Sequence, residues 1–585
     1  MKMVNSLAML GALALGTVSY ADIQVWTRDR NNPDPLVGPS QVSATVIPVP
    51  NDPTTFDVTF TTESLFTAVP AGSIEWIVWV FDPASANGDP VSSIRSLTID
   101  TTTGFRQGNI RLIIAPAPLP GSTQSQPDFP ISWDRLLFFT GVLDLGSITT
   151  IPADFAPSVS ACIAVAGNVG TATALNPRDK AEVGQIYRLQ AQGRTVNNQF
   201  LGGNIFADIV AAGPDSLAIV SSQIPNSTDV DRKAIGYIVA GKSIQGNIVS
   251  EGSPFGGPNN AVRSGSIEAV VVSSATESDP GITGNILAQR GTINSILTTG
   301  MIGTDAAAKS QIRAGRGITQ IRAIAESSST VLGVDFFADV TANLLGGDVD
   351  TFFRQDKSLN KLETAGNFIG TINADFIRPP TDTSTELDWG IFVGGTFTGD
   401  IHVRASVLGA SIAIGSFTAP TTAMPNTGHI VIDHSLDGAV VATAANGKIP
   451  YISIGRTPTA NFYRPGMLGS DSEPQTVPFR PWQPAPFNQP QVDSMIAAPE
   501  IGTITISNMF QAGDKRYAPR IESPKIGTLI IDDFRQGLVW SGHLEYVLDA
   551  NGNPTIDAAT GRPNLLTPQD DTNITQKSPK SNSAV

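Results

Sequence analysis

The sequence has little charge, almost no cysteine and few histidines. Of its 585 residues 15% are charged, and it contains one cysteine and four histidines. A single cysteine, Cys162, excludes an intramolecular disulfide and a cysteine-based zinc site. Cys162 lies in the apolar run 161–165, so we expect a buried thiol rather than a reactive one. The fold must then be stabilised by packing and backbone hydrogen bonds.

Long apolar runs are also missing. Beyond the N-terminus no stretch reaches the ~20 apolar residues that a membrane helix needs, so no membrane span is predicted. The N-terminus combines Lys2, an apolar segment over 6–16 and a small-x-small sequence ending at Ala21. These features are typical of a signal peptide over residues 1–21. We therefore expect a secreted protein, extracellular or periplasmic, whose mature chain begins at Asp22.

Basic residues are fewer than acidic ones, with 37 Lys and Arg against 52 Asp and Glu. A uniformly acidic surface disfavours nucleic acid as a partner and is compatible with divalent cations or neutral glycans. The 55 glycines and 42 prolines divide the chain into short segments. Such punctuation favours strands and turns over long helices, so we predict an all-β fold.

One tripeptide is abundant: glycine, then a small or polar residue, then Ile, Val or Leu. Copies begin at Gly146, Gly167, Gly184, Gly203, Gly246, Gly265, Gly291, Gly347, Gly370, Gly399, Gly428, Gly502 and Gly527. Most successive copies lie 17 to 30 residues apart. Units this small bury their apolar side only by stacking on their neighbours, which indicates a repeat protein. We expect Gly and Asn to supply corners with positive φ.

Over residues 141–535 this pattern resembles the right-handed parallel β-helix, or pectate-lyase-like, class of β-solenoid. The resemblance rests on repeat length and on the Gly-x-Ile corners, and it concerns architecture alone. It implies short parallel strands stacked about 4.8 Å apart along one axis. A generic solenoid and an extended array of β-sandwiches are the alternatives.

Residues 22–140 lack the regular tripeptide. Apolar segments separated by turns predict strands over 23–27, 42–49, 56–61, 74–81, 94–99, 110–114 and 131–139. Several short strands in about 120 residues suggest a smaller β-sandwich-like domain that precedes the solenoid. The alternative is that the solenoid already begins near Val91.

Residues 456–499 interrupt the repeat with an irregular, proline-rich insertion. Its aromatic and basic side chains are of the kind that stack on sugars or dock proteins, and the ligand-binding candidates are Phe462, Tyr463, Arg464, Arg480 and Trp482. A polyproline strap packed on the solenoid is the alternative. We expect residues 536–564 to cap the open end of the solenoid or to form a hairpin, and residues 565–585 to be a disordered tail.

The segment 430–434, Ile-Val-Ile-Asp-His, resembles the Ile-Asp-His core of a pectate lyase motif. In that family neighbouring turns supply calcium-binding carboxylates and an arginine abstracts a proton beside the uronate carboxyl. The resemblance implies Asp433, His434 and Arg456 as catalytic candidates. Val431 stands where the family has an aromatic residue, and the arginine motif and the earlier aspartate pair are missing. Polar residues that end a strand explain the same segment.

Calcium is the one cofactor that the sequence leaves open. Asp549, Asn551 and Asn553 have the spacing of a calcium loop, but Pro554 replaces its glycine, and Asn551-Gly552 equally predicts a hairpin turn. No nucleophile motif or phosphate-binding loop is present. The sequence favours a secreted, non-enzymatic structural, surface or adhesive β-solenoid protein whose partner is a polysaccharide or a cell-surface protein. The alternative is a carbohydrate-active enzyme or glycan-binding protein of the β-helix class, similar to polysaccharide lyases.

Overall fold

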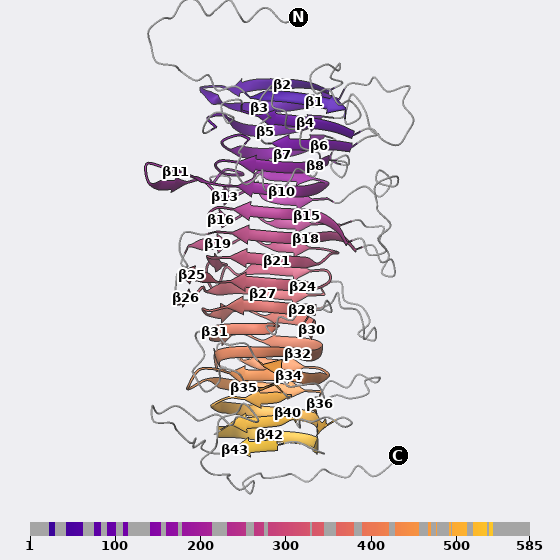
Figure 1. Ribbon diagram of the computed structural model, residues 1–585, viewed down its shortest axis with the longest axis vertical. Coiled ribbons are helices and arrows are strands. Elements are labelled where there is room, and N and C mark those ends of the chain that lie inside the picture. The colour runs from indigo at the N-terminus through magenta and orange to yellow at the C-terminus, as the bar shows by residue number, and fades with distance from the viewer. Residues whose placement is uncertain are drawn as a thin grey trace, which may run out of the picture.

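Every named element in the described part of this computed structural model is a strand, as the composition predicts. The strands are stacked along one long axis (Figure 1). The structure describes residues 23–29, 42–62, 75–82, 90–100, 109–114, 141–151, 153, 159–172, 178–212, 231–252, 263–273, 279–327, 330–343, 358–379, 389–419, 427–455, 466–469, 475–476, 491–492, 494–511, 519–523, 525–534 and 538–541.

The first of three stacks of parallel strands, ladder 1, runs from one end of the described chain to the other. Its fourteen pairings, at about 4.8 Å each, give a length of about 70 Å. Its strands in order are β3 (Asp52–Thr62), β5 (Ser93–Asp100), β7 (Leu145–Ile151), β9 (Lys180–Val183), β14 (Asp208–Ala211), β17 (Ile248–Ser250), β20 (Ile286–Ala288), β23 (Ser310–Ala314), β27 (Phe336–Ala342), β30 (Ile372–Ile377), β32 (Ile401–Phe417), β33 (His429–Ile432), β35 (Lys448–Ile454), β40 (Glu500–Gln511) and β42 (Lys525–Phe534).

Ladder 2 runs beside it and is also parallel. Its strands in order are β4 (Glu75–Phe81), β6 (Asn109–Ile114), β8 (Val159–Val165), β10 (Gln185–Ala191), β15 (Asp231–Ala240), β18 (Arg263–Val272), β21 (Ile293–Thr298), β24 (Ile318–Ala323), β28 (Ser358–Thr364), β31 (Gly390–Thr398), the second half of β32, β34 (Ser435–Ala442), β39 (Met495–Ala497), β41 (Arg520–Ser523) and β43 (Leu538–Ser541).

Ladder 3 is made of shorter parallel segments. They include β13 (Asn204–Ile205), β16 (Ser243–Ile244), β19 (Pro280–Ile282), β22 (Met301–Ile302), part of β27 and β29 (Phe368–Ile369). Outside the three ladders, β36 (Gly466–Gly469) pairs with β34 and β40. Three hairpins also project: β11 (Arg194–Val196) with β12 (Gln199–Leu201), β25 (Ala325–Ser327) with β26 (Thr330–Leu332), and β37 (Gln475–Thr476) with β38 (Gln491–Val492).

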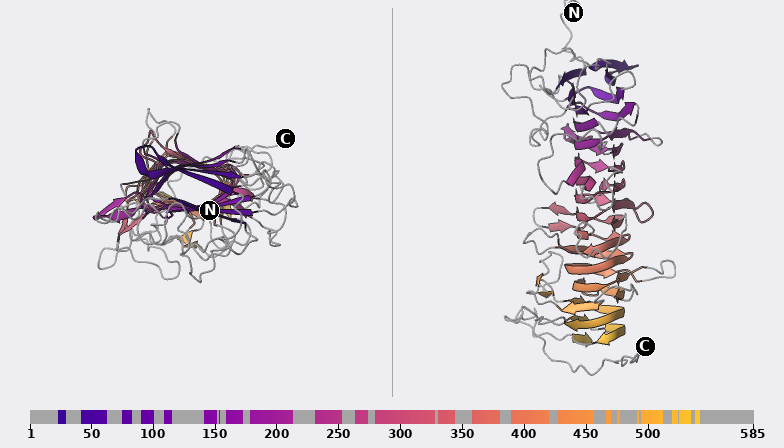
Figure 2. Two further views of the ribbon diagram at one scale, coloured as in Figure 1. Left: turned by 90° about the horizontal axis from the view of Figure 1, so that it is seen from above. Right: turned by 90° about the vertical axis from the view of Figure 1, so that its right-hand side faces the viewer.

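The chain passes through all three ladders before it returns to the first. From β17 in ladder 1 it runs through β18 in ladder 2 and β19 in ladder 3, and it reaches β20 beside β17. Corresponding residues of ladder 1 are 38 positions apart from Asn247 to Asn285 and 26 apart from Asn285 to Gln311. A coil whose turns pair in parallel is consistent with the predicted β-solenoid. The view from above shows the strands surrounding a common centre (Figure 2).

Aliphatic side chains fill the inside of the coil. In ladder 1 Ile209, Ile248, Ile286 and Ile312 lie above one another and are fully buried. The Gly-x-Ile copies supply many such residues, but they do not occur once per turn. Ile186 lies in ladder 2, Ile205 in ladder 3 and Ile248 in ladder 1. Each ladder needs an inward aliphatic residue after the corner that precedes its strand. Two successive copies of the tripeptide, 17 to 30 residues apart, can therefore lie in different ladders or on successive turns of the same ladder.

The expected boundary near residue 140 is not a break in the coil. The strands predicted over 42–49, 56–61, 74–81, 94–99 and 110–114 are present as β2 (Val42–Val49) to β6, and the one predicted over 131–139 lies outside the described residues. However, β3, β5 and β7 pair in parallel, as do β4, β6 and β8. These pairings join the described strands of residues 52–114 to the coil, which therefore includes strands that precede the Val91 of the alternative.

Candidate functional site

A column of polar side chains follows the outward face of ladder 1. Each member directly precedes the buried aliphatic residue of its turn. Asn247 donates from its backbone N and its Nδ2 to Asp208 Oδ1 at 2.8 and 3.0 Å, and Asn285 donates in the same way to Asn247 Oδ1. The members of this polar column are Asp208, Asn247, Asn285, Gln311, Asp339, Thr371, Asp400, His429 and Tyr451.

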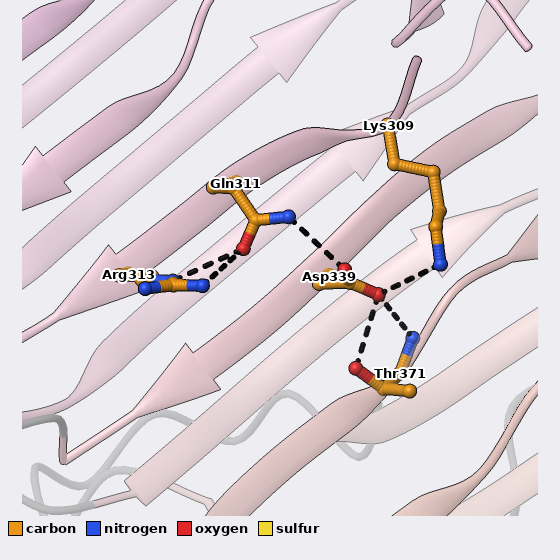
Figure 3. Close-up of polar contacts among 5 residues, drawn as sticks. All are labelled: Lys309, Gln311, Arg313, Asp339 and Thr371. Atoms are coloured by element: carbon orange, nitrogen blue, oxygen red, sulfur yellow. Dashed lines mark hydrogen bonds and ion pairs between the residues drawn. The ribbon is translucent and has the colours of Figure 1, made fainter. Parts of the chain in front are cut away.

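Asp339 has many contacts within the polar column (Figure 3). Its Oδ1 accepts from Thr371 N at 2.9 Å, from Thr371 Oγ1 at 3.0 Å and from Lys309 Nζ at 3.2 Å, while its Oδ2 accepts from Gln311 Nε2 at 3.0 Å. Burial raises the pKa of the Asp339 carboxyl, but the hydrogen bonds from Gln311 and Thr371 and the charge of Lys309 outweigh it and hold the pKa below its ordinary value. This carboxylate therefore joins three turns of the coil.

Two histidine–aspartate pairs link the next turns of ladder 1 in opposite directions. His402 Nε2 lies 3.1 Å from Asp433 Oδ2, so that here the histidine belongs to the earlier turn. His429 Nδ1 lies 3.7 Å from Asp400 Oδ1, so that here the histidine belongs to the later turn. The side chains of His402 and His429 are 42% and 31% exposed, and the His429 ring meets the Tyr451 ring edge-on at 5.1 Å.

We take the pairs His402–Asp433 and His429–Asp400, called the histidine pairs below, as the candidate functional site. Each imidazole lies beside a carboxylate, and both imidazoles reach solvent. They lie on the outside of a regular sheet, and their carboxylates are already engaged across turns. The arrangement suits binding or bridging better than a reaction that needs an enclosed, water-free site.

The structure describes two of the three residues that resemble the lyase motif. Asp433 follows β33 and contacts His402, while Arg456 lies outside the described residues. His434 is 3% exposed, and its backbone N donates to the Ala405 carbonyl at 3.0 Å. Burial lowers the pKa of the His434 imidazole and outweighs the opposite effect of Asp433. His434 is thus a buried side chain, and its burial favours the neutral form of the imidazole.

An aspartate on an earlier turn than Asp433 is held by nitrogen donors. Two turns before Asp433, Asp375 accepts from Asn343 Nδ2, and its Oδ1 lies 2.6 Å from Arg404 Nη2. Within the parts of the chain that the structure describes, no three His, Cys, Asp or Glu side chains are grouped to hold a metal ion. The other calcium candidates, Asp549, Asn551 and Asn553, lie outside the described residues.

The ligand-binding candidates of the proline-rich insertion also lie outside the described residues: Phe462, Tyr463, Arg464, Arg480 and Trp482. The prediction for the single cysteine is confirmed. Cys162 is 1% exposed, and burial raises the pKa of its thiol to about 12. A thiol that stays protonated at neutral pH is a poor nucleophile.

Sequence reasoning missed His402 as the partner of Asp433 and Asp400 as the partner of His429. The signal was present in two copies of the repeat that begin 29 residues apart, at Gly399 and Gly428. Aligned, they place His402 beside Val431 in the sheet, two positions from Asp433. Alternate residues of a strand share a face, so side chains from successive copies can meet on it.

Comparison with known proteins finds no matching family model, no matching curated protein and no matching solved structure. A search of the described residues for a helix able to cross a bilayer, long and apolar enough, found none. The interpretation of the site therefore rests on its own geometry.

Proposed function

We propose that the chain is a secreted structural or adhesive protein whose coil is a right-handed parallel β-helix that serves as a rigid rod. The observation that carries this proposal is the polar column, because its side chains contact one another from turn to turn. Such contacts stiffen a long repeat structure and leave an exposed, regular polar face. A polysaccharide or a cell-surface protein is the partner that this face suits.

The test follows the precursor through a cell and then probes the purified mature protein. We expect the chain to begin at Asp22 outside the cytoplasm and to bind isolated envelope polysaccharide without shortening it. Binding is measured by co-sedimentation, and the polymer length by size-exclusion chromatography. Retention of the uncleaved precursor in the cytoplasm, or progressive shortening of the polymer, would overturn the proposal.

A second candidate function is cleavage of a uronate polymer, and the His402–Asp433 pair favours it because it places a proton acceptor on an exposed face. The assay is the ultraviolet absorbance of unsaturated products, with and without calcium. If this function is right, Asp433→Asn loses the activity while Asp335→Asn, whose carboxylate only accepts from Asn367, keeps it. Equal activity in both variants, or none in the wild type, rejects it.

A further inference from the structure

The two ends of the coil differ in how their last strands are protected. At the N-terminal end β2 pairs antiparallel with β3, and β1 (Gln24–Asp29) pairs antiparallel with β4. β2 contains Pro48, which lacks the N–H that a further strand would need. At the other end of the described chain, ladder 1 stops at β42, which pairs on one side only, with β40.

The middle of β42 is suited to pairing with another strand. Residues 526–531 read Ile-Gly-Thr-Leu-Ile-Ile, six positions with neither charge nor proline. Such segments at an open edge pair readily with further strands. Leu529 and Ile531 are only partly buried, whereas Ile504 and Ile506 one turn earlier are fully buried. Ile530 is 40% exposed on the outward side. Among the described residues, no further strand of ladder 1 covers this last layer of the core.

Charges of opposite sign lie at the two ends of the same strand. Lys525 begins β42, and Asp532 and Asp533 follow its uncharged centre. In an antiparallel pair of two identical strands, the lysine of each comes to lie beside the aspartates of the other. Centred on Leu529, such a pair places Lys525 opposite Asp533 of the second copy and Thr528 opposite its Ile530. A parallel pair would place like charges together, which is unfavourable.

We propose that β42 is the interface of a symmetric dimer, in which the edges of two copies pair antiparallel at the C-terminal ends of their coils. The same patch then meets itself across a twofold axis, so the assembly closes at two copies. Pro48 at the opposite end opposes growth into a filament. This inference does not depend on the proposed function.

The test is the molar mass of the full mature chain, measured by light scattering over a range of concentrations. We expect twice the chain mass for the wild type and a dissociation constant raised about tenfold or more by Ile530→Lys, because a charged edge resists pairing. The matched control is Ile47→Lys, which adds the same charge at a 56% exposed isoleucine on β2 and should leave the dimer intact. Thr528→Lys, also on the exposed side of β42, repeats the test if Ile530→Lys fails to fold.

Charge reversal tests the antiparallel arrangement. Lys525→Glu and Asp533→Lys should each weaken the dimer, and the double variant should restore it, because the pair of charges is then only exchanged. Thermal unfolding of each variant separates this effect from loss of the contact between Lys525 and Glu500, which lie 3.1 Å apart. A wild type that is monomeric at every concentration, as it would be if residues 542–585 of the same chain covered the edge, would overturn the proposal. So would a dimer that Ile530→Lys and Thr528→Lys leave unchanged.

Discussion

At Gly399 an added Cβ would lie 1.7 Å from the carbonyl oxygen of Gly370, one turn earlier. At Gly246 it would lie 1.8 Å from the oxygen of Ala207. Gly399 also has a φ of 142°, but Gly246 is not among the residues with positive φ. The glycine of the tripeptide is therefore needed above all because neighbouring turns approach so closely, and only at some copies because the corner requires its conformation.

Gly246→Ala tests this close approach, because Gly246, unlike Gly399, has no positive φ that would strain an alanine. We expect it to lower the free energy of unfolding by about 3 kcal/mol, since the new methyl group must displace the backbone of the neighbouring turn. The measurement is denaturant unfolding followed by circular dichroism. Gly333→Ala is the matched control, because its nearest non-adjacent atom, Gly366 Cα, is at an ordinary 3.5 Å. Equal losses in the two variants would contradict the explanation.

His434 makes stability depend on pH. Because burial lowers its pKa in the folded state, the unfolded chain binds a proton first as the pH falls below about 6.5. Its contribution to stability is thus complete above pH 6.5 and is lost as the pH falls through the lowered folded pKa. We expect the free energy of unfolding to fall less for His434→Gln than for the wild type when the pH is lowered from about 7.5 to about 5. Urea unfolding at each pH measures this free energy. The exposed His402 offers His402→Gln as the control, and the same flattening there would refute the assignment to His434.

How far the sequence predicts single residues depends on what each residue contacts. Burial of Cys162 follows from its apolar neighbours, because burial is a local property of a strand. The contact between Asp433 and His402 depends on which copies of the repeat are adjacent in space. That adjacency is decided by insertions of different length between copies, which carry no regular pattern. Asp433 was therefore predicted as a site residue, and its partner His402 was not.

At the scale of elements, ladder 3 contains a stack of aromatic rings inside the coil. The centroids of Phe336 and Phe368 are 4.8 Å apart, those of Phe368 and Phe397 4.7 Å, and those of Phe397 and Phe417 5.2 Å. Their spacing is close to the distance between neighbouring strands, so each ring occupies one turn. The first three rings are fully buried.

Phe368→Ala removes a ring from the middle of this stack. We expect a loss of about 4 kcal/mol in the free energy of unfolding, since a cavity opens between two turns and two ring contacts are lost. Phe368→Leu keeps most of the volume and should cost about 1.5 kcal/mol or less. Calorimetry of both variants checks the difference. Equal losses would mean that the rings do not support the packing between turns.

The strands themselves were largely predictable, and their partners were not. β2 has the predicted bounds of 42–49, β5 is one residue longer than predicted at each end, and β6 is one residue longer at its start. Alternating burial shows that a segment is a strand with one inner face. It does not show whether the neighbouring strand belongs to a hairpin or to the next turn. That ambiguity is why residues 22–140 suggested a sandwich although their strands pair in parallel with later turns.

At the scale of the whole molecule, the described coil is about 70 Å long along ladder 1. Two copies that pair at β42 have their axes in line, so their coils together should span about 140 Å. Small-angle X-ray scattering of the wild type and of Ile530→Lys measures this directly. A dimer that is wider rather than longer would show that the copies associate through their sides and would contradict pairing at the ends.

The antiparallel pair at the N-terminal end also determines the order of folding. β2 and β3 are joined by a turn at Asn51, whose φ of 67° suits a tight reversal, so they can pair with little loss of chain entropy. Each parallel pair in ladder 1 instead requires the chain to complete a turn, and the partners are 22 residues apart at His429 and Tyr451 and 52 apart at Ile449 and Ile501. We therefore expect the first hairpin to act as a template to which each later turn is added. The chain then becomes stable in the order in which the ribosome makes it, and β42 is among the last strands to find its place.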